Sequence, residues 1–171
     1  MNYLVSLAKS AVESYINDKV VINPPDNLPK DFLKMKSGVF VTIEKDDHLR
    51  GCIGTYLPTK ENIAQEIISN AIAAATEDYR FDPIEKEELP SLSYTIYILN
   101  EPKLIKDIKD LNPKKYGVII RTTSGKSALL LPDLKDVDTT EQQLEITCQK
   151  GGINPKKEQL IIYRFTVKKY K

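Results

Sequence analysis

The amino-acid sequence predicts an α+β protein with a mainly antiparallel sheet and packed helices. Three observations support this class: strands come in pairs joined by short polar turns, amphipathic helices lie between those pairs, and the regular strand-helix alternation of a parallel sheet is missing. At 171 residues the chain suits a single domain over residues 1–171, because that length can bury a sizeable core without disulfide or metal staples.

The first third of the chain predicts a helix followed by a hairpin. Apolar residues recur at helical spacing over residues 4–16, which predicts an amphipathic helix that ends before Pro24. Residues 38–44 and 49–56 then predict two strands, and the polar turn at residues 45–47 suits a hairpin between them.

A second helix and a buried strand are predicted in the middle of the chain. The helix follows Pro58, with Thr59 as its N-cap and Glu61 in its first turn. Its alanine-rich stripe allows close docking against a sheet. Residues 92–99 are rich in β-branched and aromatic side chains, which predicts a buried strand.

The last third predicts a second hairpin, a helix and a final strand. The hairpin comprises residues 117–122 and 127–131. Either Thr139 or Thr140 caps a helix that runs to about Lys150, and the glycine pair 151–152 ends it in the left-handed conformation. Residues 159–168 supply the last strand.

Composition excludes several classes of function. The formal net charge is +1 and the lysine pairs are scattered, so no strong field favours nucleic acid or an anionic membrane as a partner. Two distant cysteines give no disulfide framework, which predicts a cytoplasmic protein. The first helix carries charges and lacks a signal-peptide pattern, and no stretch is apolar enough to span a bilayer.

The segment from His48 to Tyr56 carries the strongest functional signal. It places an arginine, a thiol and two glycines in one apparent strand, and glycines in a strand indicate a bulge or a close approach by other atoms. Strict alternation puts Arg50 and Cys52 on the same face. A guanidinium close to a cysteine favours the thiolate, which is the nucleophilic form, whereas a buried cysteine without such a neighbour is a small apolar core residue.

The motif Leu49-Arg50-Gly51-Cys52-Ile53-Gly54-Thr55 resembles the signature of the AMMECR domain family, which includes protein A of the bacterial AmmeMemoRadiSam system. Further agreement in the same order covers nearly the whole chain: Phe40-Val41, Arg80-Phe81-Asp82-Pro83, Glu87-Glu88-Leu89-Pro90, Leu129-Leu130-Leu131-Pro132, and Cys148 with Gly151. The resemblance implies an α+β fold with a larger and a smaller lobe. It also implies Memo-like and radical-SAM proteins as partners, and it brings no assigned reaction.

Other chemical motifs are weaker. The segment around Lys126 lacks the first glycine of a phosphate-binding loop, because that position is Arg121. His48 lies roughly 13 Å from Cys52 in an extended chain, at about 3.3 Å per residue, so direct activation within the strand is not expected. A zinc site requires Cys148 to fold near Cys52, so no metal site is predicted. The cysteine spacing of a radical-SAM cluster is absent.

Two functions therefore remain open. In the first, the protein is an enzyme or enzyme subunit that acts on a small anionic substrate. Cys52 is then the nucleophile or acid/base, with Glu88 or Asp78 as proton acceptor. The substrate-binding residues in this hypothesis are Arg50, Gly51, Gly54, Thr55 and Arg80.

In the second function, the protein is a non-catalytic binding or scaffold partner of Memo-like and radical-SAM proteins. A groove opened by the glycines receives a peptide or a protein edge, and Arg50 recognises an acidic group. For Arg80 and its neighbours, the alternative is a purely structural ion pair within their loop.

Overall fold

The computed structural model describes residues 2–171, which form two compact units. The first unit comprises residues 2–98 and Lys168–Lys171, and the second comprises Leu99–Val167. Each unit has its own four-stranded sheet and its own buried core. The expected α+β class, with antiparallel strand pairing, is confirmed.

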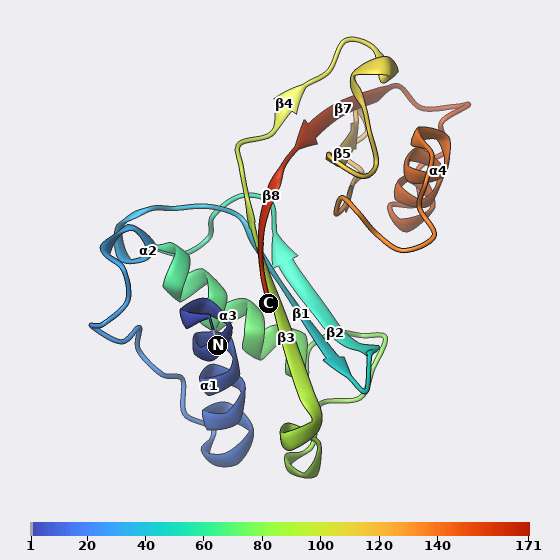
Figure 1. The fold of residues 1–171 in the computed structure, drawn as a ribbon. Helices are drawn as coiled ribbons and strands as arrows, with labels where there is room; N and C mark the ends of the chain where they lie inside the picture. Colours follow the sequence, from blue (N-terminus) through green and yellow to red (C-terminus); the bar gives the residue numbers. More distant parts are fainter. Residues whose placement is uncertain (1) are drawn as a thin grey trace. The chain divides into compact units, whose positions relative to one another are not determined.

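The first sheet has the strand order β2-β1-β3-β8 (Figure 1). Its strands are β1 (Val39–Lys45), β2 (His48–Thr55), β3 (Leu92–Leu99) and β8 (Val167–Tyr170). The predicted hairpin of β1 and β2 is confirmed, and Asp46 and Asp47 close it with φ angles of 51° and 61°. Aspartate tolerates this left-handed conformation, which two-residue hairpin turns require. In this order, β2 is an edge strand.

Helices cover one face of this sheet. They are α1 (Tyr3–Asp18), α2 (Lys30–Lys34), α3 (Ile63–Thr76) and the 3-10 helix η1 (Lys86–Ser91). The alanine-rich side of α3 packs on β1 and β2, and α1 packs on α3. Alternate residues of β1 (Val39, Val41 and Ile43) are fully buried under these helices, so the core lies between the sheet and α3.

The N-terminus of α3 differs from the prediction. The N-cap is Asn62, whose side chain accepts a hydrogen bond from the N–H of Gln65 at 2.9 Å. Thr59 does not cap the helix, because its N–H and its hydroxyl both donate to the carboxylate of Glu66. The helix therefore begins later than predicted, and Glu61 lies outside its first turn.

The second unit contains a sheet with the order β4-β7-β5-β6. Its elements are β4 (Lys103–Leu104), η2 (Ile108–Asp110), β5 (Gly117–Thr122), β6 (Ser127–Leu130), α4 (Thr140–Lys150) and β7 (Leu160–Phe165). Helix α4 packs on β5 and β6, and Cys148 is buried beside Ile120 and Ile153. The helix is capped by Thr139, and Gly152 beyond its end has a φ of 61°, as the sequence predicts.

The predicted last strand, residues 159–168, is two strands. It forms β7 and β8, with Thr166 between them, and each strand belongs to a different sheet. Among the helices of residues 2–171, none combines the length and the apolar character that crossing a membrane requires.

Candidate functional site

Strand β2 carries the signature motif, and a β-bulge interrupts it at Arg50. Ile43 of β1 pairs with Gly51 and Glu44 pairs with Leu49, so Arg50 has no partner on β1. A bulge inserts one residue into a strand and changes the direction in which side chains point. The two-residue alternation used to assign faces therefore fails at this position.

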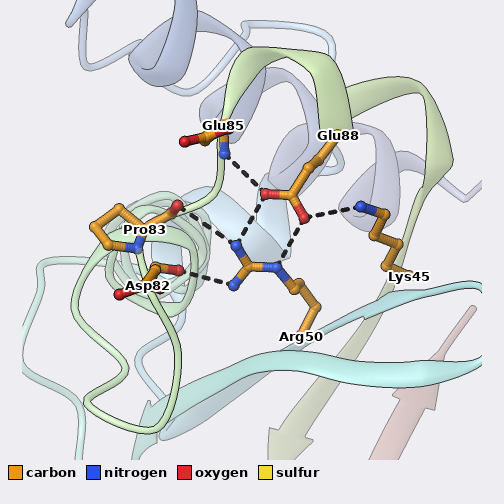
Figure 2. A network of polar contacts seen from close by, with 6 residues as sticks. All are labelled: Lys45, Arg50, Asp82, Pro83, Glu85 and Glu88. Atoms are coloured by element: carbon orange, nitrogen blue, oxygen red, sulfur yellow. Dashed lines mark hydrogen bonds and ion pairs between the residues drawn. The ribbon is translucent and has the colours of Figure 1, made fainter.

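The Arg50 side chain ends in a dense polar network (Figure 2). Its Nε and Nη2 atoms donate to the two carboxylate oxygens of Glu88, both at 2.9 Å. The other bonds are Nη1 to the Asp82 carbonyl at 2.9 Å and Nη2 to the Pro83 carbonyl at 3.4 Å. The side chains of Arg50 and Glu88 are mostly buried, with exposed fractions of 17% and 16%. Such a bidentate pair fixes orientation as well as charge.

Glu88 accepts from two further donors, Lys45 Nζ at 3.1 Å and the Glu85 N–H at 3.0 Å (Figure 2). The hydrogen bonds from Arg50 are the main cause that lowers the pKa of Glu88 from 4.5 to about 2. A carboxylate with so low a pKa is a weak base at neutral pH. The geometry therefore indicates that Glu88 is a structural anion, and it does not favour the expected role of Glu88 as a proton acceptor.

The Arg50 guanidinium and the Cys52 sulfur have partners on different faces of the sheet. Arg50 shares the carboxylate of Glu88 with Lys45, which follows Val39, Val41 and Ile43 on the core side of β1. The Cys52 sulfur accepts a hydrogen bond at 3.2 Å from the hydroxyl of Thr42. Because side chains alternate along a strand, Thr42 lies on the face of β1 opposite to the core side. The expectation that Arg50 and Cys52 are neighbours on one face is therefore wrong, and the bulge is the cause.

A second arginine is electrostatically coupled to Cys52. Arg80 donates from Nε and Nη2 to the two oxygens of Asp78 at 2.9 and 2.7 Å. The hydrogen bond to Asp78 is the main cause that raises the pKa of Arg80, and the Cys52 side chain contributes in the same direction. Of Arg50 and Arg80, it is therefore Arg80 whose pKa responds to the charge of this sulfur.

Asp78 connects this ion pair to the backbone of β2. Its Oδ2 atom accepts the N–H of Cys52 at 2.9 Å, and its side chain is only 4% exposed. Hydrogen bonds from Arg80 are the main cause that lowers the pKa of Asp78 from 3.8 to about 2. The carboxylate is therefore ionised at neutral pH and offsets the charge of Arg80 beside Cys52.

Both glycines of the motif are packed against the protein's own backbone. A Cβ atom at Gly51 would lie 2.1 Å from the carbonyl oxygen of Ala74 in α3, and one at Gly54 would lie 2.3 Å from that of Val39. Real Cβ atoms do not approach oxygen so closely, so only glycine fits at either position. The close approach expected from the sequence is confirmed, and it is made by α3 and β1. The space beside these glycines is thus filled, which does not favour their expected part in binding a substrate.

Thr55 also serves the fold. Its hydroxyl donates at 3.2 Å to Glu66, which is 1% exposed. Thr59 and the Lys60 N–H satisfy the same carboxylate. This buried acid was missed in the sequence, where it is one polar position on the docking face of an apolar helix.

The segment of residues 78–83, here called the edge loop, lies along the outer edge of β2. The Asp78 carboxylate accepts a hydrogen bond from the N–H of Cys52, and the carbonyls of Asp82 and Pro83 accept hydrogen bonds from the Arg50 guanidinium. The Phe81 ring also lies 6.0 and 5.5 Å from the guanidinium carbons of Arg50 and Arg80. An open strand edge invites pairing with other chains, and a covering loop prevents it.

The edge loop presents one aromatic side chain to solvent. Tyr79 is 95% exposed, although both of its neighbours are tied to Asp78's ion pair. Nothing in the sequence marks Tyr79, since an aromatic residue between polar residues is ordinary in a strand or a loop. Its exposure between two pinned residues is visible only in the structure.

The remaining candidates lie elsewhere. His48 is exposed at the hairpin turn, where its Nδ1 atom lies 2.7 Å from the Asp46 carbonyl. Cys148 is in the second unit, and burial raises the pKa of its thiol. No cluster of three or more His, Cys, Asp or Glu side chains suited to a metal ion occurs among residues 2–171.

The fold and the site define a two-sheet α+β protein whose signature strand is held under a loop by two arginine–carboxylate pairs. Residues 5–170 match the family model AMMECR1, and the chain belongs to this family. A crystal structure of an uncharacterized protein from Pyrococcus horikoshii has the same fold, with a TM-score of 0.90 and 31% identity, covering 98% of this chain and 88% of that one.

Relatives by sequence have different lengths. A Thermotoga maritima protein is 48% identical over 168 residues, covering 98% of this chain and 96% of its own length. A Clostridium acetobutylicum protein is 41% identical over the same length of alignment, which covers only 35% of that longer protein. The chain thus corresponds to about a third of the Clostridium relative.

Proposed function

We propose that this chain is a non-catalytic binding protein that docks a partner protein at the edge loop. The observation that carries the proposal is Tyr79, 95% exposed on a loop whose adjoining residues are fixed. Tyrosine and arginine dominate the binding energy of protein interfaces, and Arg80, 42% exposed at its side chain, stands next in the chain.

The rigidity of the edge loop supports this function. Two bidentate ion pairs and the Phe81 contacts hold the loop on β2. Binding costs less entropy when the contacting side chain sits on a backbone that is already ordered. Arg50 of the signature and its partner Glu88 then support the docking loop and need not touch the partner protein.

The partner that we propose is a Memo-like or a radical-SAM protein, as the family resemblance implies. The Clostridium relative supports a role next to other protein domains, because the matching region makes up only 35% of that chain. A domain that occurs within a longer chain works next to further polypeptide, which is the situation of a docking module.

The test is a binding titration with purified Memo-like and radical-SAM proteins from the same genome. We expect Tyr79→Ala to weaken binding by about 2 kcal/mol, roughly thirtyfold, because it removes an interface anchor. Tyr3→Ala is the matched control, since Tyr3 is 62% exposed on α1 and outside the edge loop. Equal affinity of the Tyr79→Ala and wild-type proteins, with unchanged unfolding midpoints, would reject the proposal.

A second candidate function is thiol chemistry on a small anionic molecule at Cys52. It is favoured by the half-buried sulfur, the hydroxyl of Thr42 that donates to it, and the coupled guanidinium of Arg80. A donated hydrogen bond and a nearby cation are the surroundings typical of reactive cysteines. Arg80 here takes the place first expected for Arg50.

This candidate is tested by alkylation with iodoacetamide near neutral pH. We expect Cys52 to react faster than N-acetylcysteine, and Thr42→Val to slow the reaction, because the donor to sulfur is lost. Cys148, which is 4% exposed, supplies a slow internal reference. A rate at Cys52 no higher than that of the model thiol would exclude the activated cysteine while leaving the docking proposal intact.

A further inference from the structure

A groove runs along the side of α3 that does not face the sheet. Five residues of α3 and its C-cap residue Glu77 line it at spacings of three and four; the five are Gln65, Ile68, Ser69, Ile72 and Ala73. Tyr15 of α1 and the connection at residues 21–24 form the other wall. This groove contains none of the signature residues and none of the edge loop.

The dimensions of the groove fit an extended chain. Gln65 near the start of α3 and Glu77 at its C-cap are twelve residues apart, which is about 18 Å at 1.5 Å per residue. An extended peptide of five residues spans about 17 Å at 3.3 Å per residue. The groove has a volume of about 480 Å³.

The lining offers polar groups at intervals between apolar ones. Ile68 and Ile72 form the floor, and Val21, which is 61% exposed, stands on the opposite wall. The side chains of Gln65, Ser69 and Asn23 have no hydrogen-bond partner within residues 2–171. A carboxamide carries a donor and an acceptor side by side, which matches the N–H and C=O groups of a peptide backbone.

The ends of the groove carry opposite charges. Lys60 lies just before the N-terminus of α3, and Glu77 follows its C-terminus. The dipole of α3 adds to this difference in charge, because the positive end of a helix is its N-terminus, near Lys60, and the negative end is its C-terminus, near Glu77. A ligand with an acidic group near Lys60 and a basic group near Glu77 is therefore complementary to the whole length of the groove.

We infer that this groove binds an extended peptide segment of about five residues from another protein, with apolar side chains on the α3 floor, an acidic residue at Lys60 and a basic residue at Glu77. A fatty acyl chain matches the apolar floor, but it leaves the carboxamides of Gln65 and Asn23 unpaired, which disfavours binding. The groove is separate from the edge loop, so this inference does not depend on Tyr79.

The test uses a phage-displayed random heptapeptide library selected on the full chain. Ser69→Trp, which fills the groove from a half-exposed position, serves for counter-selection. We expect the enriched peptides to contain apolar residues between an acidic and a basic end. A synthetic peptide of the enriched sequence should lose at least about tenfold in affinity with Ser69→Trp, and none with Tyr79→Ala.

Charge reversal gives the second measurement. The single variants Lys60→Glu and Glu77→Lys should each weaken binding, and the double variant should prefer a peptide with its charged ends exchanged. Ala73→Gln provides a second groove-filling change if Ser69→Trp lowers the unfolding midpoint. The inference is wrong if no groove-dependent sequences are enriched, if charge exchange has no effect, or if dodecanoate alone displaces the selected peptide completely.

Discussion

Glu88 joins three parts of the first unit through one carboxylate. It binds Arg50 from β2, Lys45 from β1 and the N–H of Glu85, which completes a capping box at η1. Of these partners, Arg50 has the greatest consequence, because its side chain is 17% exposed and would be left without its bidentate acceptor. A buried cation without its partner costs much more than an exposed one.

We expect Glu88→Gln to lower the free energy of unfolding by about 2 kcal/mol, because a neutral amide cannot match the charge of Arg50. Lys45→Met is the control and should cost less than about 1 kcal/mol, since exposed ion pairs contribute little. Lys45 is 37% exposed at its side chain. Urea unfolding of both variants measures the difference, and equal losses would contradict the structural ranking of the two partners.

The residue types of the site could be predicted from the sequence, but their pairing could not. Arg50, Cys52, Arg80 and Glu88 were singled out, and all of them lie on or beside β2. The bulge at Arg50 places its side chain beside different residues from those that strict alternation predicts, because one extra residue changes which face each side chain points to. Alternation contains no sign of such an insertion unless the partner strand is known.

At the scale of elements, the position of β2 depends on how closely α3 can approach it. The Ala74 carbonyl occupies the place where a side chain at Gly51 would begin. The alanine-rich face of α3 and the glycine of β2 therefore form one contact, and a change in either moves both elements. This close packing also brings Asp78, just beyond the end of α3, to the N–H of Cys52.

We expect Gly51→Ala to lower the free energy of unfolding by about 3 kcal/mol or more, because the new methyl group meets backbone that cannot rotate away. Gly152→Asn is the control. At Gly152 an added Cβ has nothing within 4 Å, and asparagine tolerates its φ of 61° at a cost below about 1 kcal/mol. Thermal unfolding and soluble yield compare the two variants, and a stable Gly51→Ala protein would contradict the packing argument.

Most element boundaries follow from local patterns, and the exceptions depend on distant partners. The strand at residues 92–99 and the first strand of the second hairpin, at 117–122, match their predictions. Helix α3 begins late because Glu66, one turn inside it, takes Thr59 as a hydrogen-bond donor. The final segment divides at Thr166 because two sheets share it, which no local pattern of apolar residues can specify.

At the scale of the whole molecule, the two units differ in how their stability depends on acid. The first unit contains Glu88 and Asp78, both with pKa values of about 2 and both mostly buried. In the second unit, hydrogen bonding of the Asn154 N–H is the main cause that lowers the pKa of Glu158. Its ion-pair partner Lys126 is 46% exposed at its side chain, and ion pairs with an exposed partner contribute little to stability.

The first unit should therefore lose stability in acid before the second. A carboxyl group whose folded pKa is lowered stabilises the fold above its unfolded pKa, and this contribution disappears as the pH falls through the folded value. For Glu88 and Asp78 the window runs from about pH 5 to about pH 2, with a loss of about 2 to 3 kcal/mol for each group. Hydrogen exchange across this range should show the amides of β1, β2 and α3 losing protection before those of β5 and α4.

Glu88→Gln should remove about half of the pH dependence of the first unit, since, among its described residues, only Asp78 then titrates with a depressed pKa. Equal loss of protection in both units, or an unchanged pH dependence in the variant, would show that these two ion pairs do not govern acid stability.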